Sequence, residues 1–339
     1  MPSRKRLKNI GELADLAGVS RATVSRALDN SPLISLKTRE RIQQLARDYD
    51  FRLNPVARNL RAKRTNAIGV VIPLGHDVEQ HVSDPFFMRM IGLLADGLAE
   101  QGLDLVLTRV IPTGDDWLET IVKSGRVDGV ILIGQSDQHE VIDHVGQSYK
   151  PLVVWGGYED TQTHCSVGTD NRTGGYEATH HLIDQGCKNI LFLGDYHIRE
   201  IRHRYEGYER AMLESGIGAH RSRKSVHLDA NIAYKEILDY LSEAAVLPDG
   251  IFAASDVIAM SVIRAASDLK IALPDELKII GFDGLELSQR TVPSLSTIEQ
   301  DLAEGARQLV ALLLRRMNGE ETESIVLPPR LVARRSSGE

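Results

Sequence analysis

The sequence predicts an all-α three-helix head followed by an α/β body of two doubly wound parallel sheets. Two short amphipathic segments over residues 10–28 are interrupted by a glycine, and a third amphipathic segment covers residues 36–50. From residue 67 onward, continuous apolar strands alternate with amphipathic helices, as in parallel sheets covered on both faces. At 339 residues the chain is long enough for two or three domains.

Residues 10–28 predict two helices around a tight turn. Helical spacing places Ile10, Leu13, Ala14 and Ala17 on one apolar face. Gly18 follows where a helix needs a residue with positive φ to end, and a second helix begins at once. This is the helix-turn-helix arrangement, although two helices of any bundle would show the same periodicity.

The second helix has two unlike faces. Val24, Ala27 and Leu28 turn back toward the first helix, whereas the opposite face carries side chains rich in hydrogen-bond donors. Such side chains suit base edges and phosphates in a major groove. Ser20 is placed to cap this helix. The DNA contacts expected from the helix and its cap are Ser20, Arg21, Ala22, Thr23, Ser25 and Arg26.

A third helix is expected over residues 36–50, with Ser35 as its N-cap. Ile42, Leu45, Ala46 and Tyr49 form an apolar face that can close a three-helix head. The basic residues of this helix are expected to lie outside, either as a solvated face or in contact with phosphates. They are Lys37, Arg39 and Arg41.

Residues 54–64, NPVARNLRAKR, predict a helix of one and a half turns from about Pro55 to Leu60. Asn54 can cap it and Pro55 suits its first position. So short a helix is marginal in water and needs outside support. Two such segments side by side on DNA would present Leu60 as an apolar wedge in the minor groove. The DNA contacts expected here are Asn54, Ala57, Arg58 and Leu60.

Charge is distributed unevenly along the chain. Residues 1–66 hold 15 Lys/Arg and 6 Asp/Glu, a formal charge of +9, which leaves −16 for the remainder of a chain whose total is −7. A basic head on an acidic body attracts phosphate at one end and repels DNA elsewhere. Two cysteines, no apolar run of membrane-spanning length and a start without an apolar signal-peptide core predict a cytoplasmic protein with no membrane partner.

The body contains about eight strand–helix units, too many for one open sheet of ordinary width, so we divide them into two sheets. In open parallel sheets, ligands lie outside the carboxyl ends of the strands. Two such ends facing each other across a hinge make a cleft that can close. The expected strands are 67–73, 103–110, 127–134, 151–156, 189–194, 250–255, 277–282, 324–328 and 330–334.

Three stretches together resemble the LacI/GalR family of bacterial transcription regulators: VSRATVSRAL, the NPVARNL segment, and TNAIGVVIP directly after it. The resemblance extends through essentially the whole chain. It implies a body like periplasmic binding proteins of type I, a homodimer on a palindromic operator, a leucine inserted into the operator at Leu60, and base choice by Arg21 and Ala22. The implied divisions are a DNA-binding domain 1–53, a hinge 54–66, and an effector-binding and dimerisation domain 67–339, with an N-lobe of about 67–167 and 299–327 and a C-lobe of about 168–298 and 328–339.

Residues near the strand ends supply a candidate effector site. Carboxylates and guanidinium groups bind several sugar hydroxyls at once, and aromatic faces pack against the C–H side of a ring. Core packing is an equal interpretation for the phenylalanines, as is a helix cap for Asp170. Arg204 and Asp283 also match the family's R-x-x-G-[YF] and G-[FY]-D motifs. The candidates are Asp84, Phe86, Phe87, Gln135, Trp155, Asp170, Arg204, Phe252, Asp256 and Asp283.

No enzyme motif stands out. The sequence lacks a P-loop, a complete G-x-G-x-x-G, H-E-x-x-H and G-x-S-x-G, and adjacent His180 and His181 point in different directions on a helix. We therefore expect no cofactor, no metal and no catalysis. The leading hypothesis is a dimeric repressor of carbohydrate genes switched by a sugar or glucoside. The alternatives are a sugar-binding protein for transport or sensing, and an α/β enzyme fused to a DNA-binding head.

Overall fold

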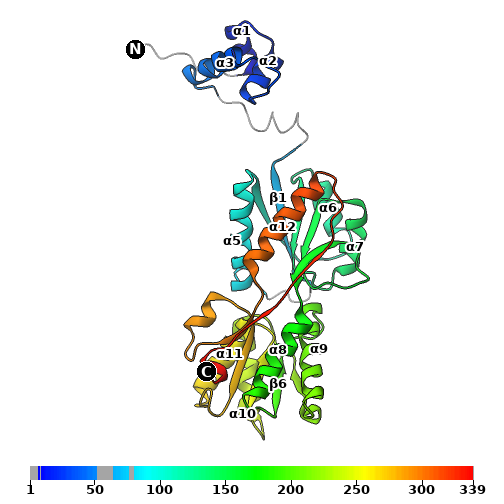
Figure 1. Cartoon of the computed structure of the whole chain (residues 1–339), viewed down its shortest axis with the longest axis vertical. Helices are drawn as coiled ribbons and strands as arrows, with labels where there is room; N and C mark the ends of the chain where they lie inside the picture. The colour runs from blue at the N-terminus through cyan, green and yellow to red at the C-terminus, as the bar shows by residue number, and fades with distance from the viewer. Residues whose placement is uncertain (1–6, 8, 52–63, 76–79, 339) are drawn as a thin grey trace. The chain divides into compact units, whose positions relative to one another are not determined.

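A computed structural model of the chain describes residue 7 and residues 9–51, 64–75 and 80–338. The chain divides into two compact units, residues 1–65 and 66–339. In the first unit the structure describes three helices: α1 (Ile10–Ala17), α2 (Arg21–Leu28) and α3 (Leu36–Asp48) (Figure 1). The expected hinge helix falls within residues 52–63, outside the described residues.

Local signals determine where the helices of the head begin and end. Gly18 ends α1 with φ +63°, a left-handed conformation that glycine adopts at little cost. The Ser20 side chain caps α2 by accepting a hydrogen bond from the Thr23 amide, and Ser35 caps α3 in the same way from Thr38. Leu13, Val24, Ala27 and Ile42, one or more from each helix, are fully buried in a common core. The expected turn and both serine caps are confirmed.

The N-lobe of the second unit contains a six-stranded parallel sheet in the order β11-β5-β4-β3-β1-β2. Its strands are β1 (Ala67–Pro73), β2 (Asp104–Val110), β3 (Gly129–Ile133), β4 (Leu152–Trp155), β5 (Cys165–Thr169) and β11 (Ile325–Leu327). Two apolar clusters lie on opposite faces of this sheet. One includes α5 (Pro85–Glu100) and α12 (Leu302–Met317), and the other α6 (Trp117–Lys123) and α7 (His139–Ser148).

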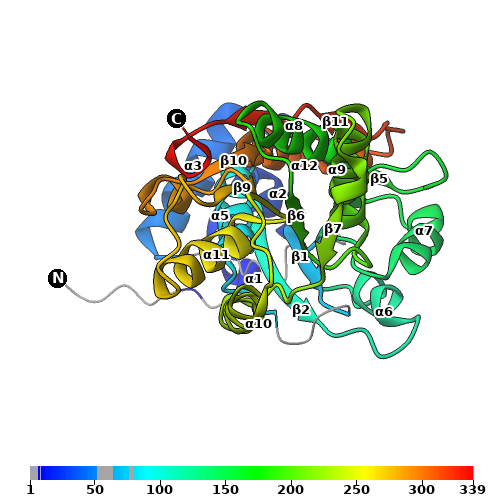
Figure 2. The same ribbon diagram turned by 90° about the horizontal axis from the view of Figure 1, so that it is seen from below.

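The C-lobe repeats this architecture with the order β12-β10-β9-β8-β6-β7, in which β12 is antiparallel to β10. Figure 2 shows α8 and α9 on one face of the sheet and α10 and α11 on the other. The strands are β6 (Ile190–Leu193), β7 (Ser222–Lys224), β8 (Gly250–Ala253), β9 (Lys278–Asp283), β10 (Ser296–Glu299) and β12 (Arg330–Val332). The helices are α8 (Asn171–Asp184), α9 (Arg199–Glu214), α10 (Ala230–Glu243) and α11 (Asp256–Asp268), with short 3-10 turns at Gly218–His220, Glu286–Arg290 and Arg335–Ser337.

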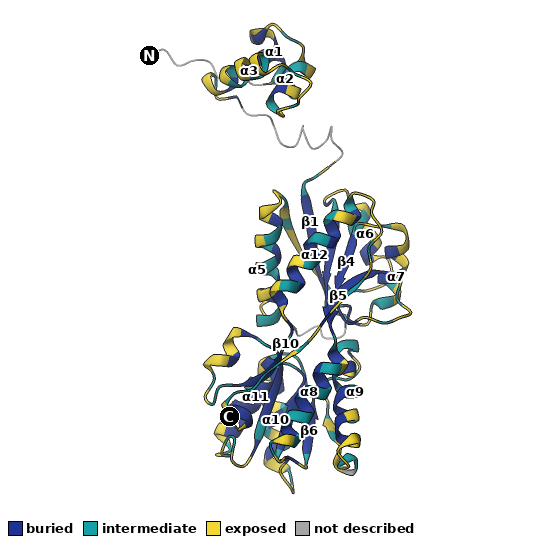
Figure 3. Cartoon of the chain, viewed as in Figure 1, coloured by how far each residue is buried: buried dark blue, intermediate teal, exposed yellow. Residues whose placement is uncertain are grey.

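The chain crosses between the lobes three times: from β5 to α8, from β10 to α12, and from β11 to β12. Burial is concentrated in the inner strands of both sheets, whereas the outer strands β2, β7, β11 and β12 are only partly buried (Figure 3). The predicted fold class is confirmed. However, β5, β7 and β10 were not among the expected strands, because their segments CSVGT, SRK and STIE lack a continuous apolar run. None of the helices in the described part of the chain has the length and apolar character that crossing a membrane requires.

Candidate functional site

The head presents a polar face on α2. Arg21, Ala22 and Arg26 are exposed and Thr23 and Ser25 half-buried, while Val24 and Ala27 fill the core beneath them. Ser20 is exposed and also caps the helix, so its hydroxyl already accepts a hydrogen bond from an amide. This side of the helix therefore offers two guanidinium groups and three hydroxyls on a rigid frame.

Two of the basic side chains of α3 are used within the head. Arg41 donates to the Ala17 carbonyl at 2.9 Å, one of the last carbonyls of α1, which have no partner inside the helix. Arg39 donates to the Asn30 carbonyl at 3.2 Å, which holds the loop after α2. Lys37 and Arg41 are exposed, as expected, and Arg39 is half-buried, so each bond uses one donor of a side chain that lies at the surface of the head. The expected DNA contacts Asn54, Ala57, Arg58 and Leu60 lie outside the described residues.

A cavity of about 850 Å³, partly open to solvent, lies between the lobes of the second unit. It is bordered by residues that follow the carboxyl ends of strands from both sheets, the position where doubly wound folds bind ligands. Six of the candidate effector residues line it: Asp84, Phe86, Phe87, Trp155, Arg204 and Asp283.

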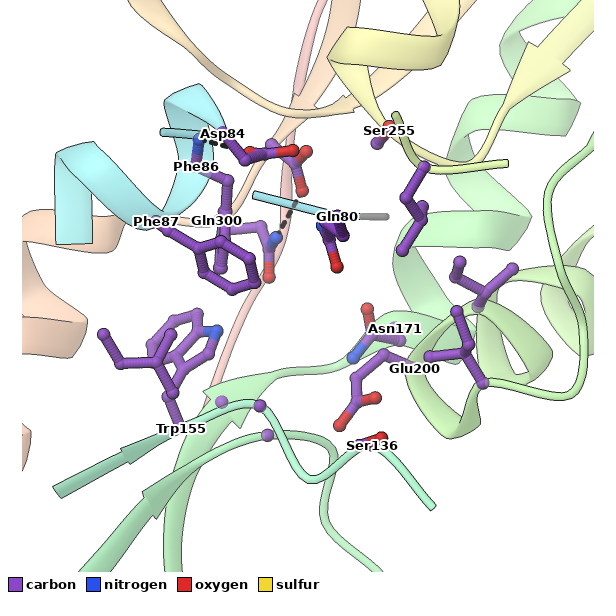
Figure 4. A pocket seen from close by; sticks show the side chains of 18 of the residues that line it. Gln80, Asp84, Phe86, Phe87, Ser136, Trp155, Asn171, Glu200, Ser255 and Gln300 are labelled. Atoms are coloured by element: carbon purple, nitrogen blue, oxygen red, sulfur yellow. Dashed lines mark hydrogen bonds between the residues drawn. The ribbon is translucent and has the colours of Figure 1, made fainter. Parts of the chain in front are cut away.

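The N-lobe contributes an aromatic wall. Phe86 and Phe87 meet edge to face with centroids 5.8 Å apart, and Phe86 lies 6.5 Å from Trp155. Asp84 caps α5 by accepting from the Phe86 amide at 2.8 Å, which sets the direction in which both phenylalanines leave the helix (Figure 4). Burial raises the pKa of Asp84. This wall offers flat apolar surface with one carboxylate at its edge.

The C-lobe contributes a network around Arg204. The Arg204 guanidinium donates through Nε to Asn171 Oδ1 at 2.8 Å and through Nη1 to the Ala254 carbonyl, and it stacks 3.8 Å from the centroid of Phe282. Asp283 Oδ1 lies 3.7 Å from Nη1 and accepts a hydrogen bond from Gln300 at 2.7 Å. All four polar side chains are buried, so the network is fixed before a ligand arrives.

Burial dominates the electrostatics of this network. It raises the pKa of Asp283 to about 7, although the Arg204 charge acts in the opposite direction, while the nearby Asp84 carboxylate adds to the increase. Burial also lowers the pKa of Arg204. Asp283 has φ +119°, which is unusual for a residue other than glycine and turns the chain sharply at the end of β9.

Four candidate residues do not line the cavity, contrary to the expectation. Phe252 packs into the C-lobe core, 5.3 Å from Phe192. Asp256 is fully buried behind the network, where it accepts from the Leu285 amide and the Thr297 hydroxyl. Asp170 caps α8 through Thr173. Gln135 donates to the Gly157 carbonyl at 2.8 Å. Each of these side chains instead packs in the core, caps a helix or forms an internal hydrogen bond.

The lobes also contact each other directly beside the cavity. Glu159, on the N-lobe loop after β4, accepts from the nearly buried His203 of α9 at 2.6 Å. The Gly157 amide donates to Glu200 Oε1 at 3.0 Å, and Arg199 donates to Gln135 at 3.3 Å. Opening of the cleft must break these contacts. Glu200 takes part in one of them and also lines the cavity, so a ligand that contacts Glu200 can affect how the lobes are held together.

Sequence reasoning missed several polar residues of the lining. Asn171 begins α8 two residues after the end of β5, and Gln300 directly follows β10; both strands lack a continuous apolar run. Had those strands been recognised, the strand-end rule would have selected both residues. The polar residues that were missed are Gln80, Ser136, Thr169, Asn171, Glu200 and Gln300.

Within the described ranges, no group of three or more His, Cys, Asp or Glu side chains could hold a metal ion. Cys165 and Cys187 are buried free thiols. His180 lies at the surface with Nδ1 3.0 Å from Asp184, and His181 contacts the Ser337 hydroxyl.

The chain is similar to known bacterial regulatory proteins. A family model described as bacterial regulatory proteins, lacI family, matches residues 9–54, and one for a periplasmic binding protein-like domain matches residues 179–337. The HTH-type transcriptional regulator DegA of Bacillus subtilis is 31% identical over 97% of each chain. Catabolite control protein A of Priestia megaterium is 30% identical, covering 97% of this chain and 98% of that protein.

Solved structures share the architecture. The lac repressor dimer bound to operator and the anti-inducer ONPF superposes with a TM-score of 0.84 at 22% identity, covering 98% of this chain and 99% of that one. The complex of the transcriptional regulator CelR with cellobiose gives a TM-score of 0.68 at 25% identity, covering 97% and 100%.

Proposed function

The chain belongs to the LacI family of bacterial regulatory proteins, and from that membership we propose that it represses genes of carbohydrate uptake or catabolism. It is a sequence-specific DNA-binding transcription regulator, as predicted. The two alternatives, a sugar-binding protein without DNA binding and an enzyme, do not fit relatives that are regulators along their whole length. We place its site of action in the cytoplasm, where the DNA is.

The proposal for DNA reading rests on the polar face of α2. Arg21 forks onto a guanine in the major groove, while Ala22 offers a methyl contact. Ser20, Thr23, Ser25 and Arg26 supply further contacts to bases and phosphates. From the segment beyond the head we propose contacts by Asn54, Ala57 and Arg58, with Leu60 as the wedge between base pairs.

A homodimer follows from an exposed apolar edge. β2 is the last strand of its sheet, and Val106 and Leu107 on it are 38% and 43% exposed. Ile111, just after the strand, is 42% exposed. An open edge with apolar side chains is a template for pairing unless a partner covers it. A second copy related by a twofold axis covers it and sets two heads on the half-sites of a palindrome.

The lining of the cavity favours an uncharged sugar. Among the described lining residues, Asp84, Glu200 and Asp283 are acidic, and Arg204 is the one basic residue. The Arg204 guanidinium is already engaged with Asn171, Ala254 and Asp283. A phosphate would meet three carboxylates without a free cation, whereas hydroxyls can donate to those same carboxylates. Aromatic rings opposite them suit the C–H face of a pyranose or furanose.

We propose that sugar binding changes how far the two lobes close, and that closure changes the spacing of the two hinge segments in the dimer. The hinge helix is short enough to be poised between order and disorder. A coupling of a few kcal/mol is then enough to change operator occupancy by orders of magnitude.

One experiment tests this function. The full-length protein selects binding sites from a random duplex library, and the selected site is then titrated with and without neutral sugars. We expect a palindrome and a sugar that changes the apparent affinity at least tenfold. Arg21→Ala should relax preference at one symmetric pair of bases. Arg47→Ala, which removes the same charge from the exposed side of α3, should weaken binding without changing preference.

Failure to select any duplex at low salt would refute the function. An unchanged preferred site for Arg21→Ala would refute the assigned role of α2 alone.

A further inference from the structure

A second hollow adjoins the cavity on the C-lobe side. It spans about 440 Å³, is partly open to solvent, and is bordered by the loops after β6 and β7 and by α10. We call it the side chamber. Ile198 and Leu228 line both the side chamber and the cavity, so the two hollows share an apolar rim. The other lining residues are Asp195, Ser225, Val226, His227 and Glu236.

The topology explains why the two hollows meet. β6 and β7 are neighbouring parallel strands, with Leu193 paired to Lys224 at their ends. The loops that follow them therefore leave the sheet at the same edge, which is also the edge that faces the cleft. Asp195 and Ile198 lie on the first loop, and Ser225 to Leu228 on the second.

The side chamber is rich in hydrogen-bond acceptors. Glu236 uses Oε2 to accept from the His227 amide at 2.9 Å, and Asp195 uses Oδ1 to accept from the His197 amide at 3.1 Å. The second oxygen of each carboxylate forms no hydrogen bond or ion pair with the residues that the structure describes. Ser225 adds an exposed hydroxyl. Two half-buried carboxylates thus keep one oxygen each for a ligand.

The chemistry of that ligand is restricted. Neither Asp195 nor Glu236 belongs to a described group of three or more His, Cys, Asp or Glu side chains that could hold a metal ion. An anion is disfavoured by two carboxylates. Hydroxyl donors match free carboxylate oxygens, and the C–H surface of a ring matches Ile198 and Leu228.

We propose that the effector is a neutral saccharide of two units, with the first in the cavity and the second in the side chamber. The linkage crosses the rim at Ile198 and Leu228, and the second unit donates hydroxyls to Asp195 and Glu236. This inference rests on the proposed function, since it assigns the length and charge of the sugar that the same cleft binds.

The test compares one-unit and two-unit sugars on the full-length protein. Calorimetry is run with D-glucose, D-galactose and D-fructose, and with maltose, cellobiose, lactose and sucrose. At least one two-unit sugar should bind tenfold or more tightly than each of its own component sugars. The sugar phosphates glucose 6-phosphate and sucrose 6-phosphate should bind more weakly than their neutral counterparts.

Variants then locate the second unit. Asp195→Asn with Glu236→Gln keeps a carbonyl oxygen to accept each amide hydrogen but removes both charges, so the loops should keep their structure. We expect about a tenfold loss of affinity for the two-unit sugar and less than a twofold change for the one-unit sugar. Glu243→Gln, an exposed carboxylate on the same helix α10, is the matched control and should change neither affinity.

The outcomes separate the inference from the function beneath it. If one-unit sugars bind as tightly as two-unit sugars and still alter operator binding, the side chamber has no such role but the proposed function stands. An equal loss for both sugar lengths in the double variant also overturns the inference. If none of these sugars binds at all, both the two-unit assignment and the sugar-switched function are wrong.

Discussion

The two walls of the cavity are built on different principles. The N-lobe wall is aromatic, with Phe86, Phe87 and Trp155 presenting apolar surface. The C-lobe side carries the polar recognition groups, including Asn171 and Glu200, which face the rings in Figure 4. The first wall can accept any ring of suitable size, whereas the second discriminates by the position of hydroxyls.

The difference also concerns stability. Burial of aromatic side chains stabilises the folded state whether or not a ligand is bound. Burying a guanidinium and a carboxylate costs free energy because both lose water. If one partner is removed, the other remains as a buried group without its counter-charge. We therefore expect substitutions in the C-lobe wall to affect both folding and binding, and substitutions of half-buried residues in the N-lobe wall to affect mainly binding.

Arg204→Ala should produce the largest effect. It removes the cation beside Asp283 and the donors to Asn171 and the Ala254 carbonyl, all within a buried network. Loss of one partner of a buried pair lowers the free energy of unfolding by roughly 3–5 kcal/mol. Urea unfolding measures this loss, and calorimetry should show that sugar binding is abolished. Arg202→Ala, an exposed residue of the same helix whose ion pair spans 4.0 Å, should cost less than about 1 kcal/mol.

The loss of unfolding free energy in Arg204→Ala should increase with pH. The pKa of Asp283 is raised to about 7 by burial, so its protonated form is favoured in the folded state. Its contribution to stability is complete below the unfolded value near 4 and is lost as the pH rises through about 7. Without Arg204 the ionised form has no counter-charge, so the variant should lose more stability at pH 8 than at pH 6. An equal loss at both values would contradict the proposed pairing.

Phe86→Ala should have an intermediate effect, confined to binding. Phe86 is half-buried, so its removal changes the core little but deletes one face of the aromatic wall. We expect the sugar affinity to fall about 10- to 100-fold, equivalent to roughly 1.5–3 kcal/mol of lost apolar contact. Phe86→Leu keeps apolar volume but not the flat ring and should recover only part of the affinity. Full recovery by leucine would mean that burial alone, and not stacking, holds the ligand.

What the sequence can predict depends on whether a feature is determined by neighbouring residues or by residues far apart in the chain. Gly18, Ser20 and Ser35 act on their own helix ends, and the structure confirms all three. The continuous apolar strands were equally clear, because a run such as ILFL is buried in any parallel sheet. β5 and β10 were missed because their burial comes from neighbouring strands and not from their own apolar content.

The candidate site was predicted only by position along the strands. Strand ends meet at the cleft, which selected Asp84, Trp155 and Asp283. The direction in which a side chain leaves a strand end depends on the packing around it. Phe252 and Asp256 therefore point into the C-lobe interior instead of the cavity. The contact between Glu159 and His203 joins residues 44 positions apart on different lobes, and no local pattern announces it.

The smallest effect on stability is expected at the hydrogen bond between Glu159 and His203, which joins the two lobes. Burial and the neighbouring Arg172 charge lower the pKa of His203 despite its hydrogen bond to Glu159. Because the folded state disfavours the charged imidazole, the contribution of His203 to stability is present above pH 6.5 and is lost as the pH falls.

His203→Gln keeps a donor toward Glu159 but cannot titrate, so the parent should lose stability relative to this variant between pH 7 and pH 5. The difference should be about 1 kcal/mol, the usual net value of one hydrogen bond. Parallel urea titrations of both proteins across this range measure it. His180→Gln, on the exposed side of α8 and outside the contact between lobes, is the matched control. If the parent and His203→Gln respond alike to pH, the bond between Glu159 and His203 does not hold the two walls together in solution.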